Sequence, residues 1–509
     1  MNLIKSTGTF SLFTLLSRIL GYLRDFFIAI YIGAGPIADA FFVAFRIPNT
    51  FRRLFSEGTF NAAFVPSYTN ENLKSKNAGK IFSDDVLNLL IIFLLILVFV
   101  IEILMPWFVL LIAPGFKENS DKLELAIKLT RITFPFLLFV SLSSFFSAIL
   151  NSHNKFGAAS AAPIILNIFL ILVLFFGKFE NEQLVFNLSY AVTFAGIIQL
   201  IFLLFFVKKY YSPKINFKFK INKKVRLFFS KLLPSIFSSG VTQINILVGT
   251  IIASFQASAV SYLYYADRIY QINLAIAGIA IGTVVLPKLS EYIKKRNLKK
   301  INFIQNKSLE LSLFLSLPAS IALLFCYNEI TSALFGYGSF DQLSVKNAGL
   351  ALYYFSFGLP AFALIKVFSS FLFARHNTKT PFYISIVSVL INIIISVSLF
   401  GKYGFIIIPI STSLSSWFNA IVLYIYLINK KHFIFLKDFY LFLIKLFFSC
   451  AIMGIVFKNL LNIFSNNLVY SSNTKLFYMI IIVLITFVVY LFISIITKAF
   501  KISDINLKY

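Results

Sequence analysis

The stretch SRILGYLRDFFIAIYIGAGPIADAFFVAFRIPNTFRRLFSE (residues 17–57) places eight ionisable side chains within two otherwise apolar segments. A charge near the middle of a bilayer is costly, so residues of this kind usually face a wet cavity and take part in function. The stretch therefore predicts helices that line a polar pathway through a membrane. The eight residues are Arg18, Arg24, Asp25, Asp39, Arg46, Arg52, Arg53 and Glu57.

Four of these residues share one face of the second segment at spacings of 7, 7 and 4: Asp39, Arg46, Arg53 and Glu57. At about 100° per residue they lie within roughly 40° of one another, and the column is about 27 Å long. This length is close to the roughly 30 Å of hydrocarbon in a bilayer. The spacing predicts one wall of a pathway across the membrane.

The composition of the whole chain is that of a polytopic membrane protein. Of its 509 residues, 59% are hydrophobic and 13% are charged, and the mean hydropathy is +0.87. The two cysteines, Cys326 and Cys450, lie far apart in apolar runs and predict neither a disulfide framework nor a metal site. The net charge of +27 is read as anchoring at a cytoplasmic membrane face rather than nucleic-acid binding.

Apolar runs of about 20 residues predict an all-α fold of about fourteen transmembrane helices. Alternate loops carry roughly 29 and about 7 lysines and arginines, which places both termini in the cytoplasm. The predicted helices are 9–33, 37–65, 85–113, 123–150, 158–178, 184–207, 228–252, 259–287, 305–326, 345–373, 380–400, 404–428, 439–462 and 475–497.

Short matches at a nearly constant offset indicate an internal repeat. Ala44-Phe45-Arg46-Ile47 recurs as Ala266-Asp267-Arg268-Ile269 at an offset of 222, and His153-Asn154 recurs as His376-Asn377 at an offset of 223. Six helices per repeat give the two halves parallel topology. The predicted organisation is an N-lobe (1–210), a C-lobe that starts with a basic linker (211–430), and helices 13 and 14 with a cytoplasmic tail (431–509).

The two lobes differ in charge. At the same offset, Arg18, Arg24 and Asp39 meet Gly240, Ile246 and Ser261, and only Arg46 has a clear counterpart, Arg268. An asymmetric, net positive central cavity suits an anionic ligand, and arginine grips phosphate in a bidentate manner.

Two structural alternatives stay open for these charges. Asp25 and Glu57 are candidates to hold an arginine in place rather than contact a ligand, and the charges as a set could pair off to join helices 1 and 2. Arg52 lies roughly 140° from the column, so snorkelling to the interface is an equal reading for it. For Asn167 and Asn392, which occupy like places in the two halves, we expect hydrogen bonds between helices.

Catalysis finds little support in the sequence. No nucleophile–base pair, metal cluster or nucleotide motif occurs in a segment predicted to face water, and the histidines are expected to be structural or solvated. The interpretation is therefore a transporter rather than an enzyme.

The charged block resembles the MurJ (MviN) family of bacterial lipid II flippases, within the multidrug/oligosaccharidyl-lipid/polysaccharide exporter superfamily. The residues that carry this resemblance are Ser17-Arg18-Ile19-Leu20-Gly21, Arg24-Asp25, Gly33-Ala34-Gly35, 39–49, 52–58, Ala113-Pro114-Gly115-Phe116, 264–268 and Leu286-Pro287.

The resemblance implies a function and a site. The substrate would be lipid II, the undecaprenyl-diphosphate-linked disaccharide-pentapeptide, moved from the cytoplasmic to the periplasmic leaflet of the inner membrane by alternating access. Arg18, Arg24 and Arg268 would bind the diphosphate, with Asp39 and Arg53 also in the cavity. Asp25, Arg46, Arg52 and Glu57 would support it, and helices 13 and 14 would form a groove for the lipid tail.

No cofactor or metal is expected, and a monomer suffices; lipid II, bilayer lipids and other cell-wall synthesis proteins are the expected partners. Sodium sites of some family members use acidic residues in helices 7 and 11, whereas 228–252 and 380–400 contain no Asp or Glu. The coupling is left open between membrane potential, Na⁺ and H⁺. The alternatives are a flippase for another polyprenyl-diphosphate glycan, an ion-coupled drug exporter of the same fold, a membrane scaffold for cell-wall synthesis and a membrane glycosyltransferase.

Overall fold

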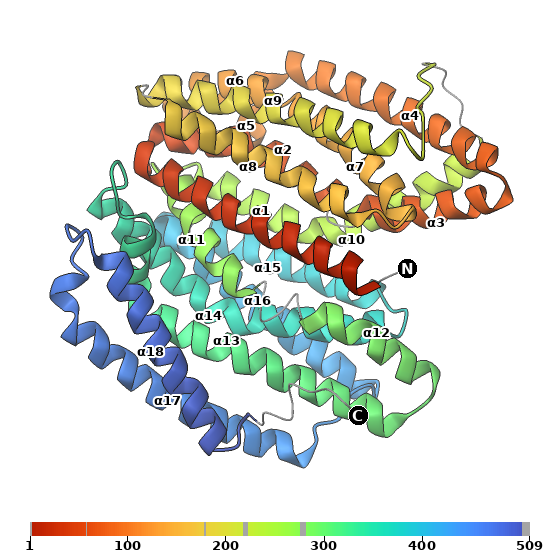
Figure 1. The fold of residues 1–509 in the computed structure, drawn as a ribbon. Helices are drawn as coiled ribbons and strands as arrows, with labels where there is room; N and C mark the ends of the chain where they lie inside the picture. The colour runs from red at the N-terminus through yellow and green to blue at the C-terminus, as the bar shows by residue number, and fades with distance from the viewer. Residues whose placement is uncertain (1–2, 57–58, 178–179, 217–221, 275–280, 501–509) are drawn as a thin grey trace. The chain divides into compact units, whose positions relative to one another are not determined.

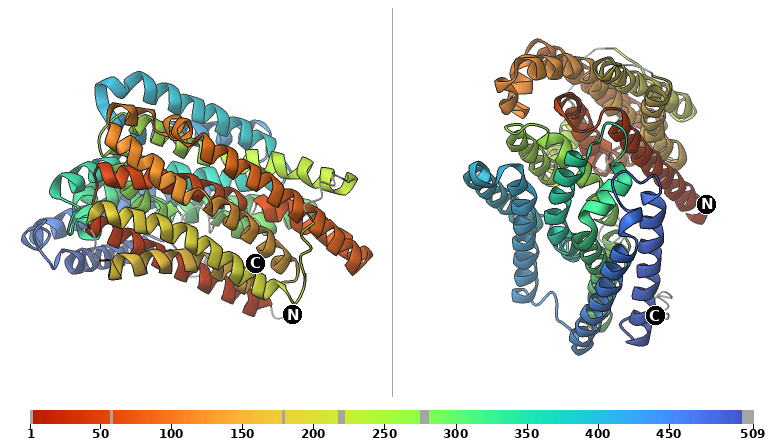
Figure 2. Two further views of the ribbon diagram at one scale, coloured as in Figure 1. Left: turned by 90° about the horizontal axis from the view of Figure 1, so that it is seen from above. Right: turned by 90° about the vertical axis from the view of Figure 1, so that its left-hand side faces the viewer.

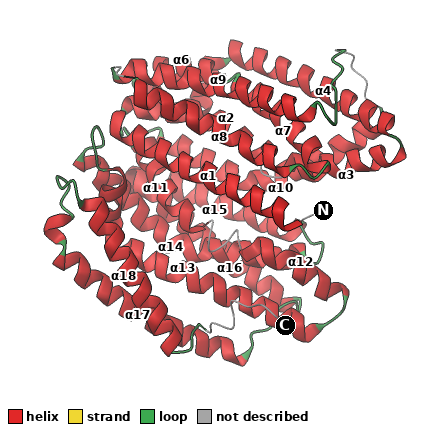
Figure 3. Cartoon of the chain, in the orientation of Figure 1, coloured by secondary structure: helices red, strands yellow, loops and turns green. Residues whose placement is uncertain are grey.

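The computed structural model describes residues 3–56, 59–177, 180–216, 222–274 and 281–500. Every regular element in these ranges is a helix, and no strand occurs among them (Figure 3). The predicted all-α fold class is confirmed. The chain divides into two compact units, unit 1 (Met1–Ser261) and unit 2 (Tyr262–Tyr509), which are described separately below.

Unit 1 runs from α1 to α10, and the first residues of α11 (Ala259–Leu274) also belong to it (Figure 1). Its elements are α1 (Leu3–Tyr31), α2 (Pro36–Ser56), α3 (Thr59–Lys74), α4 (Lys76–Ile103), α5 (Met105–Ile112), the 3-10 helix η1 (Pro114–Glu118), α6 (Ser120–Thr133), α7 (Phe136–Ser152), α8 (Phe156–Phe176), α9 (Asn181–Val207) and α10 (Lys223–Ala253).

Unit 2 continues α11 and ends with α17 and α18, which pack against each other and lie side by side in Figure 1 and in the right-hand view of Figure 2. Its other elements are α12 (Ile281–Lys294), α13 (Leu298–Phe335), α14 (Gln342–Phe373), α15 (Lys379–Tyr403), η3 (Gly404–Ile406), α16 (Ile407–Asn429), α17 (Lys437–Ile463), η4 (Ser465–Asn467) and α18 (Lys475–Ile496).

Each of the fourteen predicted spans corresponds to one helix or to two consecutive helices. The span predicted at 37–65 comprises α2 and α3, and the span predicted at 123–150 comprises α6 and α7. Proline explains two of the breaks: Pro106 lies in the first turn of α5, and Pro135 lies between α6 and α7. Proline lacks a backbone N–H and clashes with the preceding turn, so a helix tends to break there.

The described residues contain nine helical segments that are long and apolar enough to cross a membrane. Four predicted spans are missing from this set, and they hold every residue predicted to bind substrate: 9–33, 37–65, 228–252 and 259–287. Each of these four spans includes residues or side chains outside the described part of the chain, to which the search for such segments is confined.

The internal repeat is visible in the packing of helices within each unit. In unit 1, α3 packs on α4 and α7, and α9 packs on α7 and α8. In unit 2, α12 packs on α13 and α14, and α16 packs on α14 and α15. The same order of neighbours in both halves supports the parallel repeat.

Two buried asparagines, one in each unit, make the same kind of hydrogen bonds to a loop backbone. Asn88 of α4 donates to Lys214 O (2.9 Å) and accepts from Asn216 N (2.9 Å). Asn306 of α13 donates to Ile434 O (2.9 Å) and accepts from Leu436 N (3.1 Å). Each amide therefore ties the connection before a later helix, α10 or α17, to its own unit.

Further polar contacts hold the first of these connections. Asp84 accepts from the Tyr211 hydroxyl (2.6 Å), and Lys224 Nζ donates to Glu71 (2.6 Å). Lys74 also donates to Glu71, and the hydrogen bonds from Lys224 and Lys74 hold the pKa of the Glu71 carboxyl below its usual range.

In the same unit, the Tyr68 hydroxyl lies 3.0 Å from His153 Nε2. Burial lowers the pKa of this histidine, which favours its neutral form. His153 therefore contacts Tyr68 as a neutral, partly buried side chain.

Contacts group α10 with unit 1, where it packs on α2 and α3. The division by contacts therefore falls after Ser261, later than the repeat boundary expected at 210. The two boundaries differ because the repeat is defined by matching positions in the sequence, whereas the units are defined by which residues contact one another. The lobe boundaries at 210 and 430 stay a prediction.

The link from α13 to α18 depends on a buried lysine. Lys475, only 2% exposed, donates to Gly336 O (2.5 Å) and Tyr470 O (2.6 Å). Its ammonium group also lies 4.2 Å from the ring centroid of Tyr337. Carbonyl oxygens and aromatic rings thus compensate its charge and fix the start of α18 against the end of α13.

In unit 1, η1 approaches the end of α10 so closely that only glycine fits at position 115. A Cβ atom on Gly115 would lie 2.4 Å from backbone atoms of Ser254 and Phe255. The Gly115 N–H donates to Ser254 Oγ (3.0 Å), which donates in turn to Ile251 O (2.7 Å). The backbones are therefore joined by a side chain from the end of α10.

We predict that Gly115→Ala destabilises the protein by about 1–3 kcal/mol, because an added methyl group forces two backbones apart. The measurement is the thermal midpoint of the purified protein in detergent. Gly401→Ala is the matched control, since nothing lies within 4 Å of that position. Equal midpoints for the two variants would show that this approach is looser than described.

We further predict that Asn88→Leu exposes the 208–216 connection and that Asn306→Leu exposes the 430–436 connection. Each amide joins two backbone groups that leucine cannot bond. Limited trypsin digestion should cleave the first variant faster at Lys208, Lys209 or Lys214, and the second at Lys430 or Lys431. The two variants are controls for each other. Identical cleavage patterns would contradict the prediction that each asparagine holds only its own connection.

Candidate functional site

The guanidinium group of Arg24 is buried against α1 and α8. Its Nε and Nη2 donate to Asp25 Oδ1 at 2.9 and 2.7 Å, and its Nη1 donates to Asn167 Oδ1 at 2.9 Å. The Asn167 amide donates to Ser17 O (3.0 Å), which fixes its orientation. The plane of Arg24 also lies 5.4 Å from the Phe45 ring centroid on α2.

Asp25 therefore holds an arginine, one of the two roles that the sequence left open for it. The pair is almost fully buried, with side-chain exposures of 7% and 2%. Guanidinium has five N–H donors, and the contacts above use three. Among the residues described, no further partner takes the other two.

Arg18 and Arg268 lie in different surroundings. Arg18 is exposed on α1, and no hydrogen bond or ion pair involves it within the described part of the chain. Arg268 is half-buried on α11, where it donates to the Tyr264 hydroxyl (2.9 Å) and its guanidinium carbon lies 4.5 Å from the Tyr264 ring centroid. A tyrosine one turn away thus orients this arginine.

The supporting residues are only partly described. Arg46 is half-buried on α2. The side chains of Arg52 and Arg53, and the whole of Glu57, lie outside the described residues. Since α2 ends at Ser56 and α3 begins at Thr59, the column from Asp39 to Glu57 is not described as one continuous helix.

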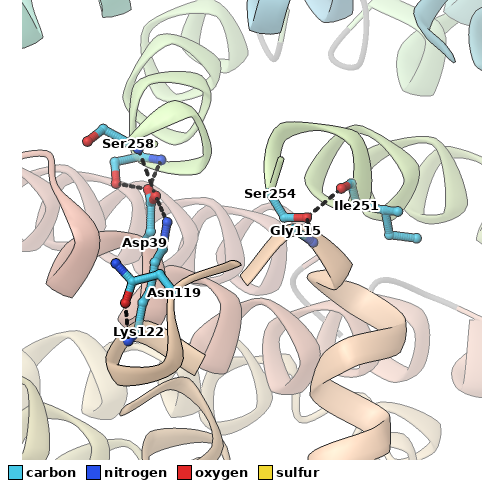
Figure 4. Close-up of polar contacts among 8 residues, drawn as sticks. Asp39, Gly115, Asn119, Lys122, Ile251, Ser254 and Ser258 are labelled. Carbon is cyan, nitrogen blue, oxygen red and sulfur yellow. Dashed lines mark hydrogen bonds and ion pairs between the residues drawn. The ribbon is translucent and has the colours of Figure 1, made fainter. Parts of the chain in front are cut away.

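Asp39 lies at the centre of a buried polar cluster in the first turn of α2 (Figure 4). Lys122 Nζ of α6 donates to Asp39 Oδ2 at 2.6 Å, and Ser258 N donates to the same oxygen at 3.0 Å. Ser261 donates to Asp39 Oδ1 through its backbone N–H (2.9 Å) and through its hydroxyl. The carboxylate is completely buried.

This cluster makes Asp39 a cap for α11 supplied by another helix. The first N–H groups of a helix have no partner inside it, and a carboxylate there also interacts favourably with the helix dipole. Ser258, just before the helix, has a φ of 61°, a left-handed conformation that brings its N–H to the same oxygen. Ser261 is also the repeat counterpart of Asp39, so equivalent positions contact each other directly.

The sequence does not predict the roles of Lys122 and of the start of α11. Lys122 is one of the about seven lysines and arginines that the sequence places in the outer loops, yet it is 7% exposed and its ammonium lies 4.0 Å from the Phe116 ring centroid. Hydropathy cannot show which charge at a helix end turns inward. The expected interhelical hydrogen bonds are found for both asparagines, since Asn392 of α15 accepts from Ser411 of α16.

The described residues contain no group of three or more His, Cys, Asp or Glu side chains placed to hold a metal ion. Their polar centres are instead built from arginine or lysine with one carboxylate. Such pairs orient the helices that carry them, and arginine is the residue type that forms bidentate contacts with phosphate.

We predict that Asp39→Asn destabilises the protein by about 3–5 kcal/mol, because it leaves the Lys122 ammonium buried without a counter-charge. The thermal midpoint in detergent measures the effect. Asp39→Asn combined with Lys122→Met should lose less than Asp39→Asn alone. Glu124→Gln, which breaks an exposed ion pair with Lys128, is the control and should leave the midpoint unchanged.

Comparison with known proteins identifies the family. The family model described as "Lipid II flippase MurJ" matches residues 28–479. The probable lipid II flippase MurJ of Rhizobium meliloti (strain 1021) is 39% identical over 438 residues, 85% of this chain and 82% of that protein. The corresponding protein of Rickettsia prowazekii (strain Madrid E) is 36% identical, with 90% of each chain covered.

The solved structures agree. A structure of a lipid II flippase MurJ in an inward closed conformation matches with a TM-score of 0.81 and 28% identity, over 96% of this chain and 98% of that one. An inward-facing multidrug-resistance transporter of the MATE family has a TM-score of 0.64 at 15% identity and shares the fold alone. Since the family model covers most of the sequence and the relatives exceed 30% identity over most of their lengths, the chain belongs to the MurJ family of lipid II flippases.

Proposed function

We propose that this multi-pass membrane protein moves lipid II from the cytoplasmic to the outer leaflet by alternating access. Lipid II carries a diphosphate between its sugar-peptide headgroup and its polyprenyl tail. The headgroup cannot cross hydrocarbon unaided, whereas the tail can remain in the bilayer. A polar wall formed by α1 and α2 would let the headgroup cross the membrane while the tail stays in the bilayer.

The observation that carries this proposal is the arrangement of Arg24. Asp25 and Asn167 fix its guanidinium plane and leave two N–H donors unused among the described residues. A prepositioned arginine loses little side-chain entropy when it binds phosphate. Arg18, exposed on the same helix, would contribute a second cation to the diphosphate.

Arg268 and Arg53 complete the proposed set of cationic contacts, with Arg46, Arg52 and Glu57 in support. Asp39 has a different proposed role, since its two oxygens are engaged by Lys122 and the start of α11. We assign it to holding the outer ends of α2 and α11 together. Opening of a pathway at this end would require the cluster to separate.

The remaining features follow from this proposal. The protein would lie in the bacterial cytoplasmic membrane with both termini in the cytoplasm, in agreement with the distribution of lysine and arginine. It would act as a monomer, without a cofactor or a catalytic group, and the groove for the lipid tail would lie along α17 and α18.

Complementation of a strain depleted of its own flippase tests the function. Wild type should restore growth, whereas Arg18→Ala, Arg24→Ala and Arg268→Ala should fail or reduce lipid II translocation at least about tenfold, because each removes a charge-assisted phosphate contact. Translocation is measured as the fraction of lipid II that an externally added reagent can label.

Lys128→Ala is the matched control, because this exposed lysine carries the same charge and lies outside the proposed site. All variants are compared at equal membrane levels. Growth supported by the three arginine variants would favour a non-transporting scaffold in cell-wall synthesis and would overturn the proposed site.

A further inference from the structure

Unit 1 contains a groove that Arg24 does not line. Its volume is about 960 Å³, and its walls come from α6, α8 and α9. Phe169 and Phe194 form an edge-to-face pair across α8 and α9, with ring centroids 5.4 Å apart. Arg131 is the charged residue of the lining, and Leu172, Phe176 and Tyr190 are among the other lining residues.

The groove opens toward the surroundings of the protein. Leu172, Phe176 and Tyr190 are 44%, 77% and 60% exposed. These helices belong to the apolar segments that are long enough to cross a membrane, so their exposed faces contact lipid. A concave, mostly apolar site in that position suits a hydrocarbon chain.

Arg131 gives the groove a polar end. Its side chain is exposed, and within the described part of the chain it has no ion pair. Glu102 of α4 is the nearby carboxylate, yet it interacts with Arg131 only through space and forms no salt bridge with it. An arginine in a membrane-facing helix requires a compensating anion or contact with water.

Arg131 lies one helical turn from a water-exposed ion pair on α6. Lys128, one turn earlier on α6, is exposed in its ion pair with Glu124, and it interacts electrostatically with Glu182 at the start of α9. Three residues of helix rise about 4.5 Å, so Arg131 lies just below that polar level. Gly177, at the end of α8, borders the same groove.

We propose that this groove binds an anionic glycerophospholipid of the outer leaflet. One acyl chain lies between α8 and α9 against Phe169 and Phe194, and Arg131 donates to the phosphate. A single cation suits one phosphodiester, and the neutral or negative headgroup attached to it determines selectivity. A choline headgroup would place a second positive charge beside Arg131, so a zwitterionic lipid is disfavoured.

The test uses the full-length protein in detergent with phosphatidylglycerol or phosphatidylcholine of identical chains. Lipid retention is measured by native mass spectrometry, and stabilisation by the shift of the thermal midpoint. Wild type should retain phosphatidylglycerol at least about fivefold better than phosphatidylcholine. Arg131→Gln should abolish this preference, whereas Lys128→Gln should keep it.

Two further variants separate the groove from a general charge effect. Leu172→Trp fills the groove from an exposed position and should reduce retention of both lipids with Arg131 intact. Glu102→Gln removes the nearby negative charge and should increase the preference for phosphatidylglycerol. Equal retention of the two lipids by wild type, or an unchanged preference in Arg131→Gln, would mean ordinary solvation by bulk lipid and would overturn the proposal. The outcome is independent of the flippase assay, since neither Arg18 nor Arg24 is altered.

Discussion

The constraint that governs this molecule is the cost of placing charge inside a membrane. Two carboxylates, Asp25 and Asp39, are almost completely buried, and each is engaged by a basic side chain. Asp39 also accepts from the backbone N–H groups of Ser258 and Ser261. Removal of one partner would leave the other buried and uncompensated. Pairing therefore determines which helices contact one another: Asp25 and Arg24 join α1 to α8 through Asn167, and Asp39 joins α2 to α6 and to the start of α11.

The repeat provides the scaffold, and the charges break its symmetry. Both halves have the same helix neighbours, and in both a buried asparagine, Asn88 or Asn306, bonds the backbone of a loop. The polar centres are not duplicated. Asp39 has a serine, Ser261, as its counterpart, and that serine is its hydrogen-bond partner. A duplicated scaffold can thus carry one asymmetric site. Two carboxylates at equivalent positions would repel each other, whereas a carboxylate and a hydroxyl form a hydrogen bond.

Apolar runs predict the helical fold well, because hydrocarbon thickness fixes how long a span must be. The helix breaks at Pro106 and Pro135 are less predictable, since proline is also tolerated within spans. The site is predicted only in part. The sequence makes Asp25 a candidate to hold an arginine but does not identify Arg24 as that arginine, and the inward turn of Lys122 depends on the packing of Phe116 and on space near Asp39. Periodicity gives a residue's face on its own helix and not the neighbour that this face contacts.

The pairing of Arg24 with Asp25 bears on how a flippase would release its cargo. A site that moves a substrate must bind it strongly enough to admit it and weakly enough to let it leave. Two unpaired arginines in a dry cavity would hold a diphosphate too tightly. Asp25 lowers the net charge at Arg24 and keeps the guanidinium oriented, so a phosphate would meet a partly neutralised donor. Under the proposed function, the carboxylate is thus part of the transport mechanism: it limits affinity while it preserves geometry.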